Sequence, residues 1–160
     1  MRVMGIDPGN RESAYCVVDL PEMRPVRFGK VVNEDLIEII CTAQDVDRFA
    51  IERVACYGMP VGREVFDTCE WIGRYTQIIT DWYDVMPGFV LRMEEKERIC
   101  HDARAGDANI RRALIDRFAT HDLKNGKGTK KEPDWFFGFA SDVWAAYAVA
   151  LVYCEREGVE

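Results

Sequence analysis

After Met1 the chain reads Arg2-Val3-Met4-Gly5-Ile6-Asp7-Pro8-Gly9-Asn10, and the prediction of the fold rests first on this stretch. The apolar run Arg2–Ile6 predicts a short buried strand, and Asp7-Pro8-Gly9-Asn10 is a strong turn sequence that ends it. A carboxylate at the end of such a strand lies at the mouth of the sheet, where α/β folds build ligand and metal sites. Asp7 is therefore the first candidate site residue, although an Asp that caps its own turn would explain it in isolation.

Beyond this first strand, two more strand patterns come first, and helix and strand patterns then alternate. Strands are predicted at Ser13–Asp19, Pro25–Val32, Arg48–Val54 and Gly88–Met93, and helices at Asn33–Cys41, Gly62–Tyr83, Asp107–Phe118 and Ser141–Arg156. The segment Asn125–Lys131 is predicted to be a mobile loop. The order βββαβαβαα predicts an α/β fold in which helices flank a five-stranded mixed sheet.

The composition is that of an ordinary globular protein. With 160 residues, of which 48% are hydrophobic and 31% charged, the chain is expected to form a single domain over residues 1–160. No apolar run is long enough to cross a bilayer, and an acid interrupts the start before a signal-peptide core could form. A cytoplasmic protein without a membrane partner is therefore expected. The six cysteines include no CxxC pair, which argues against a zinc site.

The charge is unevenly distributed along the chain. The formal net charge is −7, yet the segment from Arg92 to Lys131 holds eleven Lys or Arg residues against seven acids. Such a basic segment on an acidic body can engage phosphates locally. A solvated loop and helix face would account for the same charges equally well.

Two further carboxylates are candidates for a common site with Asp7. Glu52 lies inside the largely apolar strand Arg48–Val54, where a buried charge is costly unless a cation or partner compensates it, although an edge position open to water would also accommodate it. Asp142 opens the Ala-rich final helix, where the helix dipole alone could explain an acid. The small residues of that helix would let it pack tightly on the sheet and bring its start towards the strand ends. Three carboxylates without a histidine partner suit Mg²⁺ or Mn²⁺.

Three motifs in order resemble a known family. Gly5-Ile6-Asp7-Pro8-Gly9, then Phe49-Ala50-Ile51-Glu52-Arg53-Val54, then the Asp-led helix are similar to the RuvC Holliday junction resolvases of the RNase H-like superfamily. The resemblance covers nearly the whole chain and implies the RNase H-like fold. The stretch Asp107–Phe118, with Gly128-Thr129-Lys130-Lys131 and the Trp144 helix, is similar to the phage-encoded members. It thus implies a phage-type enzyme acting in the host cytoplasm.

The resemblance implies a metal-dependent endonuclease that cleaves Holliday junctions or other branched DNA. Asp7, Glu52 and Asp142 would be its catalytic residues and would hold two Mg²⁺ (or Mn²⁺) ions, leaving 5′ phosphate and 3′ hydroxyl ends. A homodimer would cut opposite strands, with the helix Gly62–Tyr83 and its Trp71, Tyr75 and Trp82 as the natural interface. The candidate DNA-binding residues are Lys96, Arg98, Arg104, Arg111, Arg112, Lys127, Lys130, Lys131 and Tyr57.

The sequence departs from the family pattern in two places. The family commonly has a second metal ligand three residues from its C-terminal Asp, but the positions three residues from Asp142 are Phe139 and Ala145, which bind no cation. The family also has an aromatic wedge three residues after its Glu, and here that position is Ala55, which leaves Tyr57 or Met59 as substitutes.

Two other functions fit the same motifs. One is a YqgF-like nuclease that processes RNA. The helix from Asp107 and the Gly-Lys loop favour the RuvC type over this alternative. The other is a non-catalytic branched-DNA binder on the same fold, which the missing fourth ligand would explain. The presence of Asp7, Glu52 and Asp142 together argues against that second alternative.

Overall fold

The computed structural model describes residues 1–56, 58 and 60–159. Within them, five strands form one mixed sheet in the order β3-β2-β1-β4-β5. The strands are β1 (Arg2–Asp7), β2 (Glu12–Asp19), β3 (Arg24–Val32), β4 (Arg48–Arg53) and β5 (Gly88–Leu91). β1, β2 and β3 pair antiparallel, whereas β1, β4 and β5 pair parallel. The predicted five-stranded mixed α/β sheet is confirmed.

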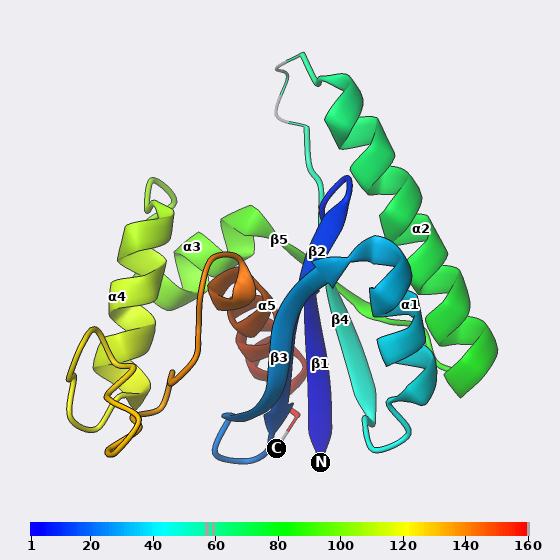
Figure 1. Ribbon diagram of the computed structural model, residues 1–160. Helices are drawn as coiled ribbons and strands as arrows, with labels where there is room; N and C mark the ends of the chain where they lie inside the picture. Colours follow the sequence, from blue (N-terminus) through cyan, green and yellow to red (C-terminus); the bar gives the residue numbers. More distant parts are fainter. Residues whose placement is uncertain (57, 59, 160) are drawn as a thin grey trace.

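Helices cover both faces of this sheet (Figure 1). On one face lie α1 (Asn33–Thr42) and α2 (Arg63–Tyr83), and on the other lie α3 (Arg92–Cys100), α4 (Asp107–Phe118) and α5 (Val143–Glu157). Strand side chains alternate between the two faces, so each face has its own apolar core. Met4 and Ile6 of β1 belong to the core under α1 and α2, whereas Val3 belongs to the core around α5.

The packing of α5 on β1 depends on Gly5. A Cβ at this position would collide with the backbone oxygen of Ala146 and would lie 2.8 Å from the backbone nitrogen of Ala150. The helix is buried along most of its length, from Val143 to Cys154. The sequence-based expectation that small residues let this helix lie tightly on the sheet is therefore confirmed.

The structure adds one helix that the sequence did not predict. β5 ends at Leu91, and α3 occupies the segment from Arg92, two residues of which were predicted as strand. Six of the nine residues of this segment are charged, so it lacks the apolar periodicity by which helices are recognised. The backbone N–H of Leu91 donates to Glu94 Oε2 at 2.7 Å and helps the helix to start there.

The segment Asn125–Lys131 is folded rather than loose. Gly128 forms an isolated bridge with Pro133, and the backbone N–H of Thr129 donates to the carbonyl of Glu132 at 2.8 Å. Gly126 and Gly128 adopt positive φ angles of 74° and 69°, which glycine accommodates without steric cost. The segment thus forms a tight turn joined by backbone hydrogen bonds, whereas its mobility stays a prediction.

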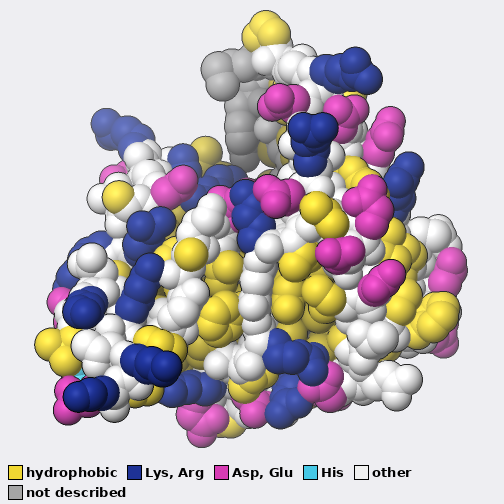
Figure 2. Space-filling view, viewed as in Figure 1, with side chains coloured by type: hydrophobic (Ala, Val, Ile, Leu, Met, Phe, Trp, Pro, Cys, Tyr) yellow, Lys and Arg dark blue, Asp and Glu magenta, His cyan; other side chains and the backbone are white. Residues whose placement is uncertain are grey.

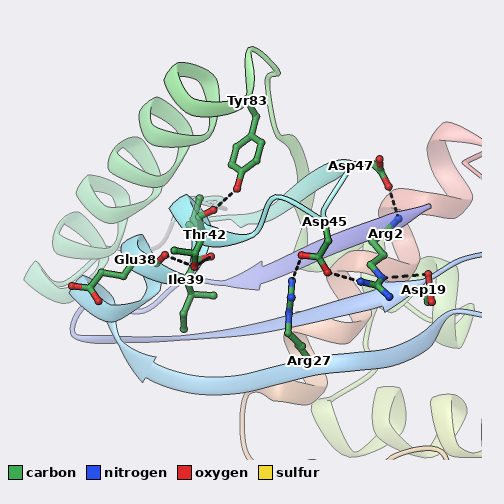
Figure 3. A network of polar contacts seen from close by, with 10 residues as sticks. Arg2, Asp19, Arg27, Glu38, Ile39, Thr42, Asp45, Asp47 and Tyr83 are labelled. Carbon is green, nitrogen blue, oxygen red and sulfur yellow. Dashed lines mark hydrogen bonds and ion pairs between the residues drawn. The ribbon is translucent and has the colours of Figure 1, made fainter.

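At the amino-terminal end of β1, ion pairs tie several strands and loops together (Figure 3). Arg2 binds Asp45, its backbone N–H donates to Asp47 at 2.8 Å, and Arg27 pairs with Asp45 at 2.7 Å. Among the described helices, none is both long and apolar enough to cross a membrane.

Candidate active site at the carboxyl ends of β1 and β4

Asp7 and Glu52 lie side by side because two parallel strands end at the same edge of the sheet. Ile6 pairs with Ile51, so the next residues of the two strands, Asp7 and Glu52, occupy equivalent positions. Both follow core residues of the α5 face at two-residue spacing, so both carboxylates lie on that face. The structure thus brings together two of the three predicted catalytic residues.

The electrostatics of Asp7 show how crowded this edge is with negative charge. Burial, and after it the neighbouring carboxylate of Glu52, raise the pKa of Asp7 from 3.8 to about 8. Asp142 raises this pKa further and Arg92 lowers it. The site therefore favours a proton, or another cation, on Asp7.

Asp142, the third predicted residue, stands at the start of α5 and pairs with a lysine. Its Oδ2 lies 2.7 Å from Nζ of Lys30. Lys30 belongs to the same row across the sheet as Asp7, because Ala14 of β2 pairs with both. The sequence analysis missed Lys30, since register is set by tertiary pairing and nothing local distinguishes this lysine.

A fourth carboxylate, Glu95 of α3, was also missed. Its side chain is fully buried, its Oε2 pairs with Arg92, and its Oε1 has no hydrogen-bond partner in the described part of the chain. Burial, and then the charge of Glu52, raise the pKa of Glu95 to about 9. The one sequence signal is the i, i+4 spacing from Glu95 to Ile99, an apolar residue that packs against the core.

The donor chemistry of these residues fits a hard divalent cation. Asp7, Glu52, Glu95 and Asp142 offer only carboxylate oxygens, which Mg²⁺ and Mn²⁺ prefer, and a buried oxygen of Glu95 has no partner among the residues that the structure describes. Within residues 1–56, 58 and 60–159, no three acidic, His or Cys side chains already surround one point as metal ligands. Instead, Lys30 and Arg92 each hold one of the carboxylates.

Beside this edge, two adjoining hollows carry basic residues. The first, of about 260 Å³, is lined by Arg92, Arg111 and Asp142 among others. The second, of about 290 Å³, is lined by Arg111, Arg112 and Lys127, and both include Trp144, over which the Arg111 guanidinium lies at 5.3 Å. Figure 2 shows Lys and Arg side chains gathered on the α4 side and acidic side chains on the α2 side.

The predicted DNA-binding residues divide accordingly. Arg111, Arg112 and Lys127 come together in the second hollow, although Arg112 also pairs with Asp116 and Asp122. The other predicted residues in the described part of the chain line neither hollow: Lys96 and Arg98 on α3, Arg104 before α4, and Lys130 and Lys131 on the turn. Tyr57, like the alternative wedge Met59, lies outside the described residues.

The two positions without a ligand are explained by packing. Phe139 is buried in an aromatic cluster, with ring centroids 4.6 Å from Phe28 and 5.1 Å from Phe136. Ala145 lines the first hollow, next to Asp142. A ligand three residues from Asp142 is therefore absent because one position serves the core and the other is an open wall.

The fold can now be compared with solved structures. Thermus thermophilus RuvC aligns over 99% of this chain and 97% of its own at 17% identity, with a TM-score of 0.69. The same protein in complex with a Holliday junction substrate aligns over 99% and 96%, with 17% identity and a TM-score of 0.72. The chain has the RuvC fold.

The RuvC fold extends to a viral protein as well. The fowlpox virus Holliday junction resolvase aligns over 98% of this chain and 99% of its own at 15% identity, with a TM-score of 0.52. No family model matches the chain, and no curated protein matches it. The predicted resemblance to RuvC is thus confirmed for the fold, although the sequence identity is only 15% to 17%.

Proposed function

We propose that this protein is a Mg²⁺-dependent endonuclease that cleaves Holliday junctions or other branched DNA. The observation that carries the proposal is the placement of Asp7 and Glu52 at equivalent ends of two parallel strands, with Asp142 close enough to raise the pKa of Asp7. Support comes from the RuvC fold, since the aligned structures are a RuvC bound to a Holliday junction substrate and a Holliday junction resolvase.

The chain's own residues have separate tasks in this proposal. Asp7, Glu52 and Asp142 would hold Mg²⁺ through their carboxylate oxygens. The same oxygens could hold Mn²⁺ in its place. Bound Mg²⁺ supplies a water of lowered pKa and stabilises charge on the leaving oxygen. Lys30, released from Asp142, would be free to contact a phosphate of the DNA.

The basic hollows beside the site would position the DNA. Arg111 and Lys127 lie in the same hollow, where their charges would bind phosphates of one arm. The acidic total charge of −7 predicts modest, salt-sensitive binding rather than tight coating of any duplex.

A homodimer would let two sites cut two strands, and α2 offers part of a surface for it. Of the aromatic residues expected at that interface, Tyr75 is buried in the protein's own core and Trp71 is half-buried beside it. Trp82 is 61% exposed, and Phe66 on the same helix is 60% exposed. Gel filtration with light scattering tests the dimer, and a monomer at working concentrations would contradict paired cleavage by a stable dimer.

The proposal is tested by cleavage of labelled four-way junctions, flaps, linear duplex and RNA duplexes with Mg²⁺ or Mn²⁺, comparing wild type with Glu52→Gln. We expect symmetric nicks in the junction that can be religated, because the ends would be 5′ phosphate and 3′ hydroxyl, and no cleavage by the variant. Cleavage of RNA in place of DNA would support the YqgF-like alternative. Junction binding without any cleavage would support the non-catalytic binder.

A further inference from the structure

We propose that Glu95 is the fourth carboxylate of the metal site and replaces the ligand that α5 lacks beside Asp142. This inference rests on the proposed function, because it assigns a residue to the same site. It moves the fourth ligand from the final helix to α3, where the sequence analysis identified only Lys96 and Arg98, as candidate DNA-binding residues.

The topology explains how an α3 residue reaches the site. β5 pairs with β4, and Val90 lies opposite Glu52 and contributes to the core of the α5 face. The chain turns into α3 two residues later, directly after Leu91, which pairs with Arg53 at the end of β4, and α3 packs against α5. Glu95 and Ile99 share the inward face of α3, which carries Glu95 beneath the surface.

The state of the Glu95 side chain is costly for a purely structural residue. It is 0% exposed, one oxygen pairs with Arg92, and the other has no partner among the described residues. An unsatisfied buried polar group costs about 1–3 kcal/mol, and a charged one costs more. Native proteins satisfy nearly all such groups, and those left open usually mark a missing water, ion or function.

The cation already present does not neutralise this cluster. Arg92 is shared, since its guanidinium binds both Glu95 and the exposed Asp107, and the charges of Glu52 and Asp7 act on the same region. Arg92 and Lys30 thus face four carboxylates, counting Asp142. A divalent cation held between Glu95 and its neighbours would occupy the open oxygen.

The test is Mn²⁺ binding to the DNA-free protein, followed by electron paramagnetic resonance and isothermal titration calorimetry. Glu95→Gln keeps the shape and replaces one carboxylate oxygen with an amide nitrogen, and Glu97→Gln is the matched control from the exposed face of the same helix. We expect Glu95→Gln to weaken Mn²⁺ binding at least about tenfold or to lose one equivalent, while Glu97→Gln binds as wild type does. Junction cleavage by Glu95→Gln should then require more metal.

The outcomes separate this inference from the proposed function. If Glu95→Gln binds Mn²⁺ with wild-type affinity and stoichiometry, Glu95 is no ligand, whereas wild-type cleavage that Glu52→Gln abolishes would leave the proposed function standing. If the wild type neither binds Mn²⁺ nor cleaves any substrate, the proposed function fails and this inference with it.

Folding of the variant is controlled separately. Circular dichroism and thermal melting in EDTA should show Glu95→Gln folded and no less stable than wild type, because the substitution removes a buried carboxylate. Should it fail to fold, Glu95→Asp keeps the charge but shortens its reach, and weaker Mn²⁺ binding by that variant is the expected result. The inference is overturned if Glu95→Asp binds Mn²⁺ as tightly as wild type does and if Mn²⁺ raises the melting temperature of both variants as much as that of wild type.

Discussion

The two ends of β1 treat charge in opposite ways. At the amino-terminal end, Arg2 and Arg27 share Asp45, and these pairs are open to solvent (Figure 3). The hydrogen bond from Arg27 lowers the pKa of Asp45, so this carboxylate keeps its charge over the whole neutral range. Asp19 and Asp47 also contact Arg2, so each acid of this exposed network has a partner.

At the carboxyl end, acids outnumber bases and are partly buried. The pKa values of Asp7 and Glu95 rise to about 8 and about 9, and an oxygen of Glu95 is left without a described partner. The difference is that the charges at one end of the sheet are paired in solvent, whereas the buried acids at the other end form the site at which we propose that a cation binds. Such paired, environment-shifted acids are typical of functional sites.

The largest effect is expected on DNA cleavage, when an acid at the carboxyl end of β1 is replaced. Asp7→Asn should lower the rate of junction cleavage by about a thousandfold or more, because a lost metal ligand removes several kcal/mol of transition-state stabilisation. Single-turnover cleavage with Mg²⁺ measures the effect. Asp45→Asn is the matched control at the other end of the strand, and an equal loss in both variants would contradict the assignment.

The close approach of α5 is the next most sensitive feature. Gly5→Ala should lower the free energy of unfolding by about 3 kcal/mol or more, because the new Cβ meets the backbone of Ala146 and Ala150. Urea unfolding followed by circular dichroism measures this. Gly73→Ala, in an exposed part of α2 where a Cβ meets nothing within 4 Å, should instead stabilise the protein by up to about 1 kcal/mol.

The pH dependence of stability should reveal the acidic cluster. Asp7 and Glu95 have ordinary pKa values of 3.8 and 4.5, so between about pH 5 and pH 8 the folded, metal-free protein holds protons that the unfolded chain has lost. The free energy of unfolding should therefore fall as the pH rises, by up to about 1.4 kcal/mol per pH unit for one proton. Urea unfolding in EDTA measures the slope, and an equal slope in Glu95→Gln would be the contrary result.

The basic hollow should contribute to DNA affinity rather than to chemistry. The double variant Arg111→Ala, Lys127→Ala should weaken junction binding about tenfold and reduce the salt dependence of the binding constant, by about 1 in the log–log slope for each lost phosphate contact. Fluorescence anisotropy at several salt concentrations provides both values. Lys130→Ala, on the exposed turn outside the hollow, is the comparison, and a larger loss there would move the DNA path to the turn.

The smallest effect is expected from the exposed ion pairs at the amino-terminal end of β1. Asp45→Asn removes exposed ion pairs with Arg2 and Arg27, which are screened by solvent and salt. We expect a small loss of stability in low salt that disappears at high ionic strength. A loss that persists in high salt would mean that this network contributes more to the fold than its exposure suggests.

Local sequence patterns predict the strands of the sheet and identify Asp7, Glu52 and Asp142 as candidate site residues. The Arg2–Asp7 strand with its turn and the apolar strand around Glu52 are local patterns, and parallel pairing of neighbouring strands brings their carboxyl ends to one edge. The same local signals failed for α3, whose charged residues have no apolar stripe, and they did not indicate the hydrogen-bonded turn at Gly126 and Gly128.

Only the tertiary structure decided which charges lie together. Lys30 meets Asp142 through the register of three strands, and Glu95 is buried where α3 packs against α4 and α5. Along the chain, Glu95 is one acid among similar neighbours, and burial alone separates it from Glu94 and Glu97. Burial depends on contacts between residues distant in sequence, so the composition of a charged helix does not determine which of its acids faces the site.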